Sequence, residues 1–153
     1  MTNLERARKV FMDTTFATEQ AGCVIEAVAD GYALCSMPVE PRHMNSLGVP
    51  MGGAIFTLAD FAFGVASNFD RDVFVSSAAD VHFMAAPKGS RLTAEAKQIR
   101  CGRRTCLFGV TVTDELGTQA AYLTFSGMKI RERKRPDGGM DCQTAGKDGI
   151  LKT

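Results

Sequence analysis

Apolar and polar residues alternate with a period of two along four segments in the second half of the chain, residues 73–84, 91–100, 105–113 and 119–130. This alternation predicts strands with one buried face, and the breaks between them carry turn-forming residues. Residues 23–28 and 32–37 predict two further strands. Asp30-Gly31 joins them, a dipeptide typical of a tight hairpin turn that requires positive φ at both central residues.

Two other segments predict helices. Residues 4–16 place Leu4, Ala7, Val10 and Phe11 on one side, as in a short amphipathic helix. Residues 51–67 are almost entirely apolar or small, and a helix that is apolar on all sides is normally buried. The order is therefore short helix, hairpin, long buried helix and four-strand meander. It predicts an α+β fold, residues 1–131, in which one antiparallel sheet wraps one central helix. Residues 132–153 are polar and glycine-rich and are expected to form a disordered tail.

The composition excludes several classes of partner. A formal net charge of +1 gives no electrostatic reason to expect a nucleic acid or an anionic membrane, and the basic run at 131–136 is short. The N-terminus has no apolar core that would make it a signal peptide. The apolar run at 51–67 is short for a membrane span and has Asp60 near its centre.

The five cysteines also favour the cytoplasm. Their number is odd and no Cys-x-x-Cys pair is present, which suits a reducing compartment. Cys101 and Cys106 straddle a predicted turn and are expected to face each other across two strands. Their spacing matches no common zinc pattern, so no metal is expected. The cysteines are Cys23, Cys35, Cys101, Cys106 and Cys142.

Asp60 is the strongest candidate for chemistry. It is the one carboxylate inside the apolar run, where an isolated charge loses its hydration and must find a partner, shift its pKa or act on a substrate. Such an Asp is a candidate general base or nucleophile. The alternative is a structural Asp that is hydrogen-bonded to neighbouring backbone.

Gly52 and Gly53 begin the same run. Backbone N–H groups at a helix N-terminus lack intrahelical partners and carry the positive end of the helix dipole. Two glycines leave these amides open to a carbonyl oxygen, so they are candidate oxyanion donors. The alternative is that both glycines only allow close packing of the preceding loop.

The chain resembles the hotdog-fold acyl-CoA thioesterases, specifically the phenylacetate-degradation (PaaI-like) subfamily. The loop reads Asn45-Ser46-Leu47-Gly48-Val49-Pro50-Met51-Gly52-Gly53, against roughly N-x-x-G-x-x-H-G-G in that family, and Leu58-Ala59-Asp60-Phe61-Ala62 matches L-x-D-x-A. One departure is Met51, which replaces the histidine of the family and cannot donate a hydrogen bond. His43 lies eight residues earlier and is not assigned that role.

The resemblance implies a hotdog fold with five or six antiparallel strands and a homodimer or homotetramer. It also implies sites between subunits, in which Asp60 of one chain serves the loop and helix start of the other. The distance along the helix agrees, since seven residues separate Gly53 from Asp60 by about 10 Å. Asn45 is expected to orient the water or the thioester, or else to cap its loop. Ser76 matches a hydroxyl position near the carboxylate, or is an ordinary strand residue.

The predicted function is therefore a cytoplasmic acyl-CoA thioesterase that needs no cofactor beyond the coenzyme A of its substrate. Gly48 and Met51 are expected to line the substrate site. Arg103 and Arg104 could contact the phosphates of coenzyme A, or be solvated surface charges. The rival hypothesis is a non-catalytic acyl-CoA-binding or ligand-sensing hotdog protein, which Met51 favours. A dehydratase on the same fold is less favoured, because the central helix has no histidine.

Overall fold

A computed structural model describes residues 1–132 of the chain. The expected disordered tail lies outside the described residues, apart from Glu132. The elements are α1 (Asn3–Phe11), a π-helical turn η1 (Phe16–Gln20), β1 (Val24–Ala29), β2 (Tyr32–Pro38), a 3-10 turn η2 (Pro41–His43), α2 (Gly52–Asn68), β3 (Val73–Phe83), β4 (Arg91–Cys101), β5 (Thr105–Asp114) and β6 (Gln119–Arg131).

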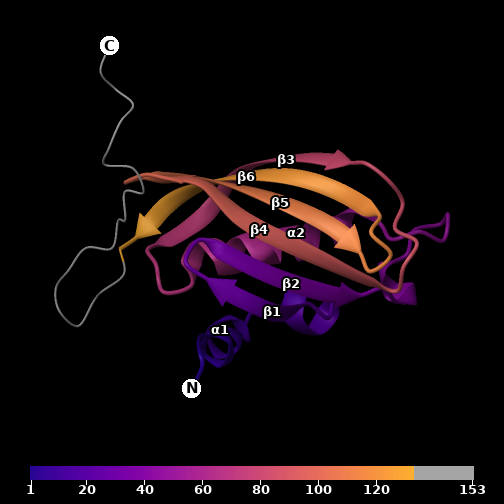
Figure 1. Ribbon diagram of the computed structural model, residues 1–153, viewed down its shortest axis with the longest axis horizontal. Helices are drawn as coiled ribbons and strands as arrows, with labels where there is room; N and C mark the ends of the chain where they lie inside the picture. The colour runs from indigo at the N-terminus through magenta and orange to yellow at the C-terminus, as the bar shows by residue number, and fades with distance from the viewer. Residues whose placement is uncertain (133–153) are drawn as a thin grey trace, which may run out of the picture.

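The long helix α2 lies against one face of a six-stranded antiparallel sheet, as the sequence predicts (Figure 1). It contacts all six strands. Leu58, Ala62 and Val65 are fully buried beneath the sheet because the helix is apolar on this side. The Phe63 ring stacks on Phe125 with ring centroids 5.0 Å apart. No helix among residues 1–132 is long and apolar enough to cross a membrane.

The strand order corrects one expectation. The sheet runs β1-β2-β4-β5-β6-β3, so only β4, β5 and β6 form a meander. β3 pairs with β6, and the chain returns from β3 across the sheet to place β4 beside β2. The expected four-strand meander is wrong because α2 crosses beneath the sheet and leaves at its far edge. Alternation along a strand identifies its buried face but not its neighbours.

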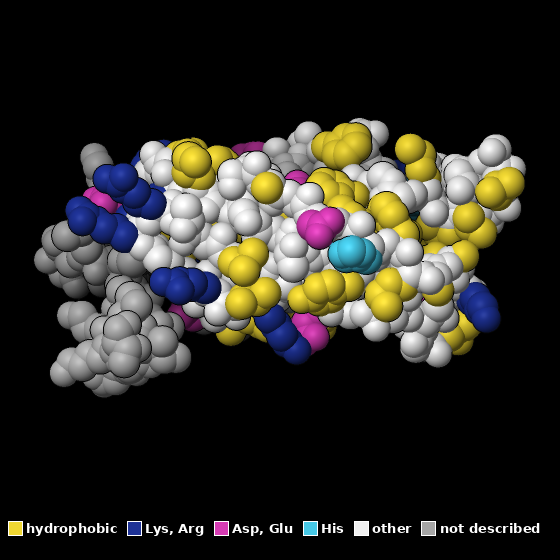
Figure 2. Space-filling view, turned by 90° about the horizontal axis from the view of Figure 1, so that it is seen from above, with side chains coloured by type: hydrophobic (Ala, Val, Ile, Leu, Met, Phe, Trp, Pro, Cys, Tyr) yellow, Lys and Arg dark blue, Asp and Glu magenta, His cyan; other side chains and the backbone are white. Residues whose placement is uncertain are grey.

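β3 forms an open edge of the sheet. Residues 75–80 are all exposed, and no other strand of the described chain pairs with the outer side of β3. Apolar side chains lie along this side of the molecule, whereas Lys and Arg gather chiefly at one end (Figure 2). An exposed strand of this length is a template for pairing with another chain.

The N-terminal helix is shorter than predicted. α1 begins after Thr2, whose side chain and Glu5 form a capping box, and ends at Phe11. Helical hydrogen bonding then stops, and the chain resumes as η1 from Phe16. Thr14 lies in the break, and β-branched residues are poor helix formers. Before the break, α1 packs on β1. After it, η1 packs on α2, where Ala17 is buried.

The predicted hairpin at Asp30-Gly31 and the predicted turn between Cys101 and Cys106 are both confirmed, with one detail changed. β1 and β2 pair up to Ala29 and Tyr32 around the Asp30-Gly31 turn. Gly31 has φ of 65°, but Asp30 keeps a negative φ, so one left-handed residue closes this turn instead of two. In the β4–β5 hairpin Cys101 lies opposite Cys106, as expected.

Candidate active site

The loop before α2 is closed by Asn45. Its side-chain oxygen accepts hydrogen bonds from the amides of Leu47 at 2.9 Å and Val49 at 3.3 Å. Gly48 has φ of 73°, a left-handed conformation that glycine adopts without strain. The Asn45 side chain therefore holds the shape of the loop. Its amide nitrogen has no hydrogen bond within residues 1–132, which leaves one donor available to a ligand.

His43 anchors this loop to the N-terminal segment. The imidazole is buried, its Nδ1 accepts from the Glu40 amide at 3.0 Å, and its Nε2 lies 2.9 Å from the carbonyl oxygen of Ala21. A backbone N–H can only donate, so the proton must be on Nε2. The His43 carbonyl also accepts from the Met51 amide at 2.8 Å. With both ring nitrogens engaged, His43 is a structural residue of this loop.

Two open amides mark the start of α2. Met51 is the N-cap residue without a side-chain cap, and its carbonyl accepts from Ala54 and Ile55. Within residues 1–132 the amides of Gly52 and Gly53 donate to no partner. They therefore present unsatisfied donors and the positive end of the helix dipole to whatever binds there.

The two glycines differ in their surroundings. A Cβ on Gly52 would lie 2.9 Å from the Phe83 ring, so any larger residue here must displace that ring, which is itself 57% exposed. A Cβ on Gly53 would meet nothing nearer than the Met51 methyl at 3.5 Å. Packing within the chain explains Gly52, whereas the space beside Gly53 is left open for a ligand or a second chain.

A cavity lies on each side of this helix start. One, of about 530 Å³, is bounded by Phe16, Met51, Gly53 and Thr57, with Arg42 and His43 at its polar side. The other, of about 540 Å³, lies between Gly52 and the segment from Phe83 to Pro87. Either space can receive a group of a substrate whose carbonyl reaches the open amides.

Asp60 lies two turns further along α2. It is half-buried, not fully buried as the apolar run suggested, because the helix stripe of Gly53, Thr57, Asp60 and Gly64 is left uncovered by the chain's own sheet. Asp60 lines a cleft of about 310 Å³ with Phe56, Phe61 and the η1 segment. Its carboxylate has no hydrogen bond or ion pair within the described chain, and burial raises its pKa.

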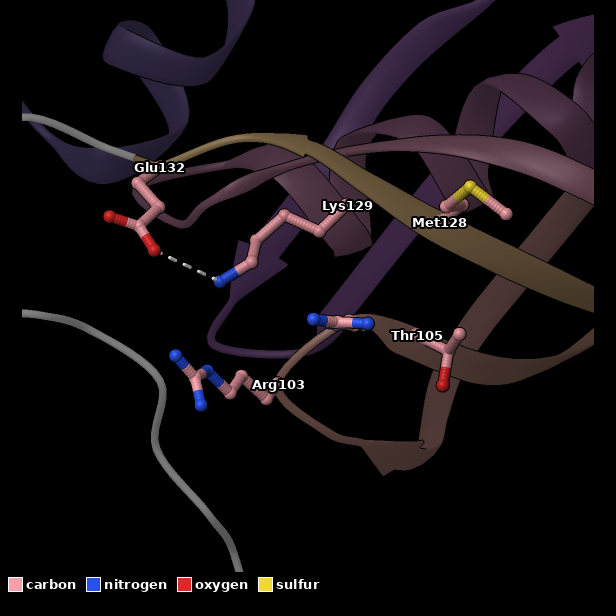
Figure 3. A pocket seen from close by; sticks show the side chains of 6 residues that line it. Arg103, Thr105, Met128, Lys129 and Glu132 are labelled. Carbon is pink, nitrogen blue, oxygen red and sulfur yellow. Dashed lines mark ion pairs between the residues drawn. The ribbon is translucent and has the colours of Figure 1, made fainter.

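Arg103 and Arg104 lie at the other end of the molecule, in the β4–β5 turn. They line a cavity of about 510 Å³ with Lys129 and Glu132 (Figure 3). Lys129 is paired with Asp72 at 3.1 Å and with Glu132 at 3.6 Å. Neither arginine has an ion pair within residues 1–132, so both are available to an anion.

Ser76 also lies away from the helix start. Phe83 packs on Gly52, and Ser76 lies seven residues back along β3, about 23 Å at roughly 3.3 Å per residue. The chain thus gathers Asn45, Gly48, Met51, Gly52 and Gly53 around one helix end. It holds Asp60, Ser76 and the two arginines at a distance.

Two residues beside these cavities were missed from the sequence: Phe16 and Thr57. Thr57 had a usable signal, because Gly53, Thr57 and Asp60 are spaced four and three residues apart and so share one helix face. Phe16 had none. Its place depends on the π-helical turn.

Comparisons with known proteins agree with this architecture. The model of the Thioesterase superfamily matches residues 47–121. A protein of Archaeoglobus fulgidus that is named as an esterase is 39% identical over 104 residues, covering 67% of this chain and 68% of that protein. The acyl-coenzyme A thioesterase PaaI of Escherichia coli is 30% identical over 111 residues, covering 72% of this chain and 78% of the relative.

Solved structures share the fold. That of the E. coli PaaI protein has a TM-score of 0.78 at 22% identity, covering 84% of this chain and 94% of the other. That of a thioesterase protein from Streptococcus pneumoniae, solved with coenzyme A, has a TM-score of 0.75 at 25% identity, covering 81% of this chain and 99% of the other. The expected hotdog arrangement, a central helix within an antiparallel sheet, is thereby confirmed.

Proposed function

We propose that acyl-CoA thioesters are the substrates of this chain, which belongs to the thioesterase superfamily and is a PaaI-like hotdog thioester hydrolase. It would release a free acid and coenzyme A without a metal or a further cofactor. The E. coli relative is named for this activity, and the S. pneumoniae structure holds coenzyme A. The observation that carries the proposal is one uncovered face of α2, where within residues 1–132 the Gly52 and Gly53 amides and the Asp60 carboxylate have no hydrogen-bond partner.

In the proposed mechanism the thioester oxygen accepts hydrogen bonds from the helix-start amides. These donors oppose the negative charge that builds on the oxygen in the transition state. Asp60 takes a proton from water as the water oxygen bonds to the carbonyl carbon, and then returns the proton to the leaving sulfur of coenzyme A. A direct attack by the carboxylate, through an anhydride that water then opens, uses the same residue. Backbone donors do not depend on the side chain at Met51.

The site would require two copies of the chain. About 10 Å along α2 separates Gly53 from Asp60, too far for both to act on one thioester. A two-fold axis that pairs exposed β3 edges would set the two α2 helices antiparallel, with the Asp60 of one copy near the helix start of the other. The same pairing would bring Ser76, Arg103 and Arg104 of one copy towards the substrate of the other. The arginines would contact the coenzyme A phosphates, and Asn45 the thioester or the water.

We further propose that the enzyme is cytoplasmic and forms a homodimer or homotetramer. The thiols of Cys23, Cys35, Cys101 and Cys106 are not joined in disulfides, as suits a reducing compartment. The mass of the protein in solution tests the assembly directly, and a monomer with full activity would contradict a shared site.

The decisive experiment is thiol release from short-, medium-, long-chain and aryl acyl-CoAs by the wild type and Asp60→Asn. We expect turnover in the wild type and a loss of at least about 100-fold in the variant. Asp30→Asn makes the same change at an exposed turn and should keep full activity. An Asp60→Asn enzyme with wild-type rates would refute the mechanism. Acyl-CoA binding with no turnover by the wild type would instead establish the rival ligand-binding function.

A further inference from the structure

Two of the cavities along α2 meet at a single aromatic side chain. The cavity of about 530 Å³ beside Gly53 and the cleft of about 310 Å³ beside Asp60 have Phe16 and Thr57 in common. Thr57 belongs to α2 and forms the floor between them. Phe16 comes from η1 on the opposite side. The ring of Phe16 therefore stands where one space ends and the other begins.

The position of Phe16 is not required by the core. Its side chain is 68% exposed, whereas the adjacent Ala17 is 4% exposed and holds η1 against α2. Phe16 belongs neither to the buried cluster nor to the residues packed on it, and within residues 1–132 its ring stacks on no other aromatic ring. An apolar side chain that stays this exposed contributes little hydrophobic stabilisation to the fold of its own chain.

The backbone fixes the direction in which Phe16 projects. η1 has π-helical hydrogen bonding, with the Ala21 amide bonded to the Phe16 carbonyl at 2.9 Å. The Cys23 amide bonds to the Ala17 carbonyl at 2.8 Å, and the His43 ring reaches Ala21 from the active-site loop. Single π-helical turns are uncommon and often occur at functional sites. Here the turn and the loop before α2 are tied together, so the ring has a defined place relative to Gly53.

We propose that Phe16 is the specificity-determining residue for acyl chain length, the wall at which the acyl group of the substrate ends. This inference rests on the proposed function. With the thioester carbonyl at the Gly53 amide, the acyl group occupies the space lined by Met51, Ala54 and Thr57 and stops at the Phe16 ring. Short and medium acyl groups fit in this space, whereas long ones must displace the ring. The preferred substrates are therefore short- and medium-chain acyl-CoAs.

The test compares the wild type, Phe16→Ala and Phe16→Trp on straight-chain acyl-CoAs from butanoyl to hexadecanoyl. Each methylene buried in the cavity should raise kcat/KM about fourfold until the chain reaches Phe16. Phe16→Ala removes the ring at which the space beside Gly53 ends, so its optimum should move to longer chains, with a gain of about tenfold or more on long chains relative to butanoyl-CoA. Phe16→Trp should move the optimum to shorter chains. The change should appear mainly in KM.

Met12→Ala is the matched control. Met12 is exposed and apolar on the same segment but lines neither cavity, so its variant should keep the wild-type chain-length profile. Profiles of Phe16→Ala and wild type that run parallel would overturn the inference. So would a Phe16→Ala protein of lower oligomeric mass that loses activity equally on all chains, because Phe16 would then be an interface residue.

The outcome for Phe16 remains separate from that for the proposed function. If the wild type binds acyl-CoAs without turnover, the hydrolytic mechanism is refuted, but the dissociation constants of the same series still decide the role of Phe16. If the acyl chain length that binds most tightly shifts in Phe16→Ala, Phe16 limits the acyl site. Dissociation constants that keep the wild-type order of chain lengths overturn this role.

Discussion

Replacing Gly53 by alanine should stabilise the protein and damage its activity at the same time. Gly53 is in the first turn of α2, and a Cβ built there has no neighbour closer than 3.5 Å. The methyl group would therefore enter open space within the chain. That space adjoins the Gly53 amide, which the proposed mechanism gives to the thioester oxygen.

The expected magnitudes have opposite signs. Alanine is favoured over glycine in a helix by up to about 1 kcal/mol, largely because glycine loses more backbone entropy on folding. A gain of roughly 0.5–1 kcal/mol should raise the Tm by about 1–4 °C in a chain of this size. The oxygen must approach the amide nitrogen to about 2.9 Å, and a methyl group beside it displaces the carbonyl. A displacement of about 1 Å can cost roughly 100-fold, so we expect kcat/KM to fall by about 10- to 100-fold.

Thermal unfolding and thiol-release kinetics of the same preparations decide the matter. Gly52→Ala is the contrast, because its methyl group would lie 2.9 Å from the Phe83 ring. The half-exposed ring must move, and this cost offsets part of the helical gain, so the Tm should rise less than in Gly53→Ala. Gly53→Ala with a raised Tm and wild-type kcat/KM would refute the assignment of the open space to substrate. A lowered Tm would refute the reading that the space is open.

Three further predictions concern titratable groups. Burial raises the pKa of Asp60, and the proposed base must be ionised, so kcat/KM should fall on acidification at a pH above the ordinary aspartate range. This fall should be absent from the residual activity of Asp60→Asn, and a fall that persists in the variant would implicate another group. Burial raises the pKa of Asp114, but bonds from the Lys88, Thr118 and Gly89 amides outweigh it and bring the value to about 2. A depressed folded-state pKa stabilises the fold above the unfolded value near 3.8, so the Tm difference between wild type and Asp114→Asn should be full at neutral pH and shrink towards pH 2; a pH-independent difference would contradict this. Burial raises the pKa of Cys23 to about 12 and of Cys106 to about 11, so neither thiol should react with an alkylating reagent before unfolding, and rapid labelling of either in the native protein would contradict their burial.

Asp60 is less buried than its apolar surroundings in the sequence suggest. A carboxylate within an apolar run predicts an unusual environment, and the structure gives Asp60 a raised pKa and no partner among the described residues. The run also suggested complete burial, yet the stripe through Gly53 and Asp60 is open. Helix residues that the chain's own sheet leaves open look the same in sequence as those that it covers.

The two glycines show a similar limit. Their position after Met51 identified a helix start with open amides, and both readings, close packing or an oxyanion site, were consistent with the sequence. The structure shows only that their surroundings differ, because Phe83 occupies the space beside Gly52, whereas within residues 1–132 a Cβ on Gly53 would meet nothing nearer than the Met51 methyl at 3.5 Å. Phe83 is thirty-one positions from Gly52, and no local pattern indicates that contact.

By itself the sequence determined the elements and the chemical candidates of this protein. Periods of two and of nearly four are consequences of backbone geometry, so strands, hairpins and the central helix could be placed from local pattern alone. Tertiary structure decided which strands are neighbours, where α1 ends and how Phe16 comes to lie over α2. It also decided that Arg103 lies at the opposite end from Gly53. These depend on contacts between residues far apart in the chain, whose free energies arise only when the sheet closes over the helix.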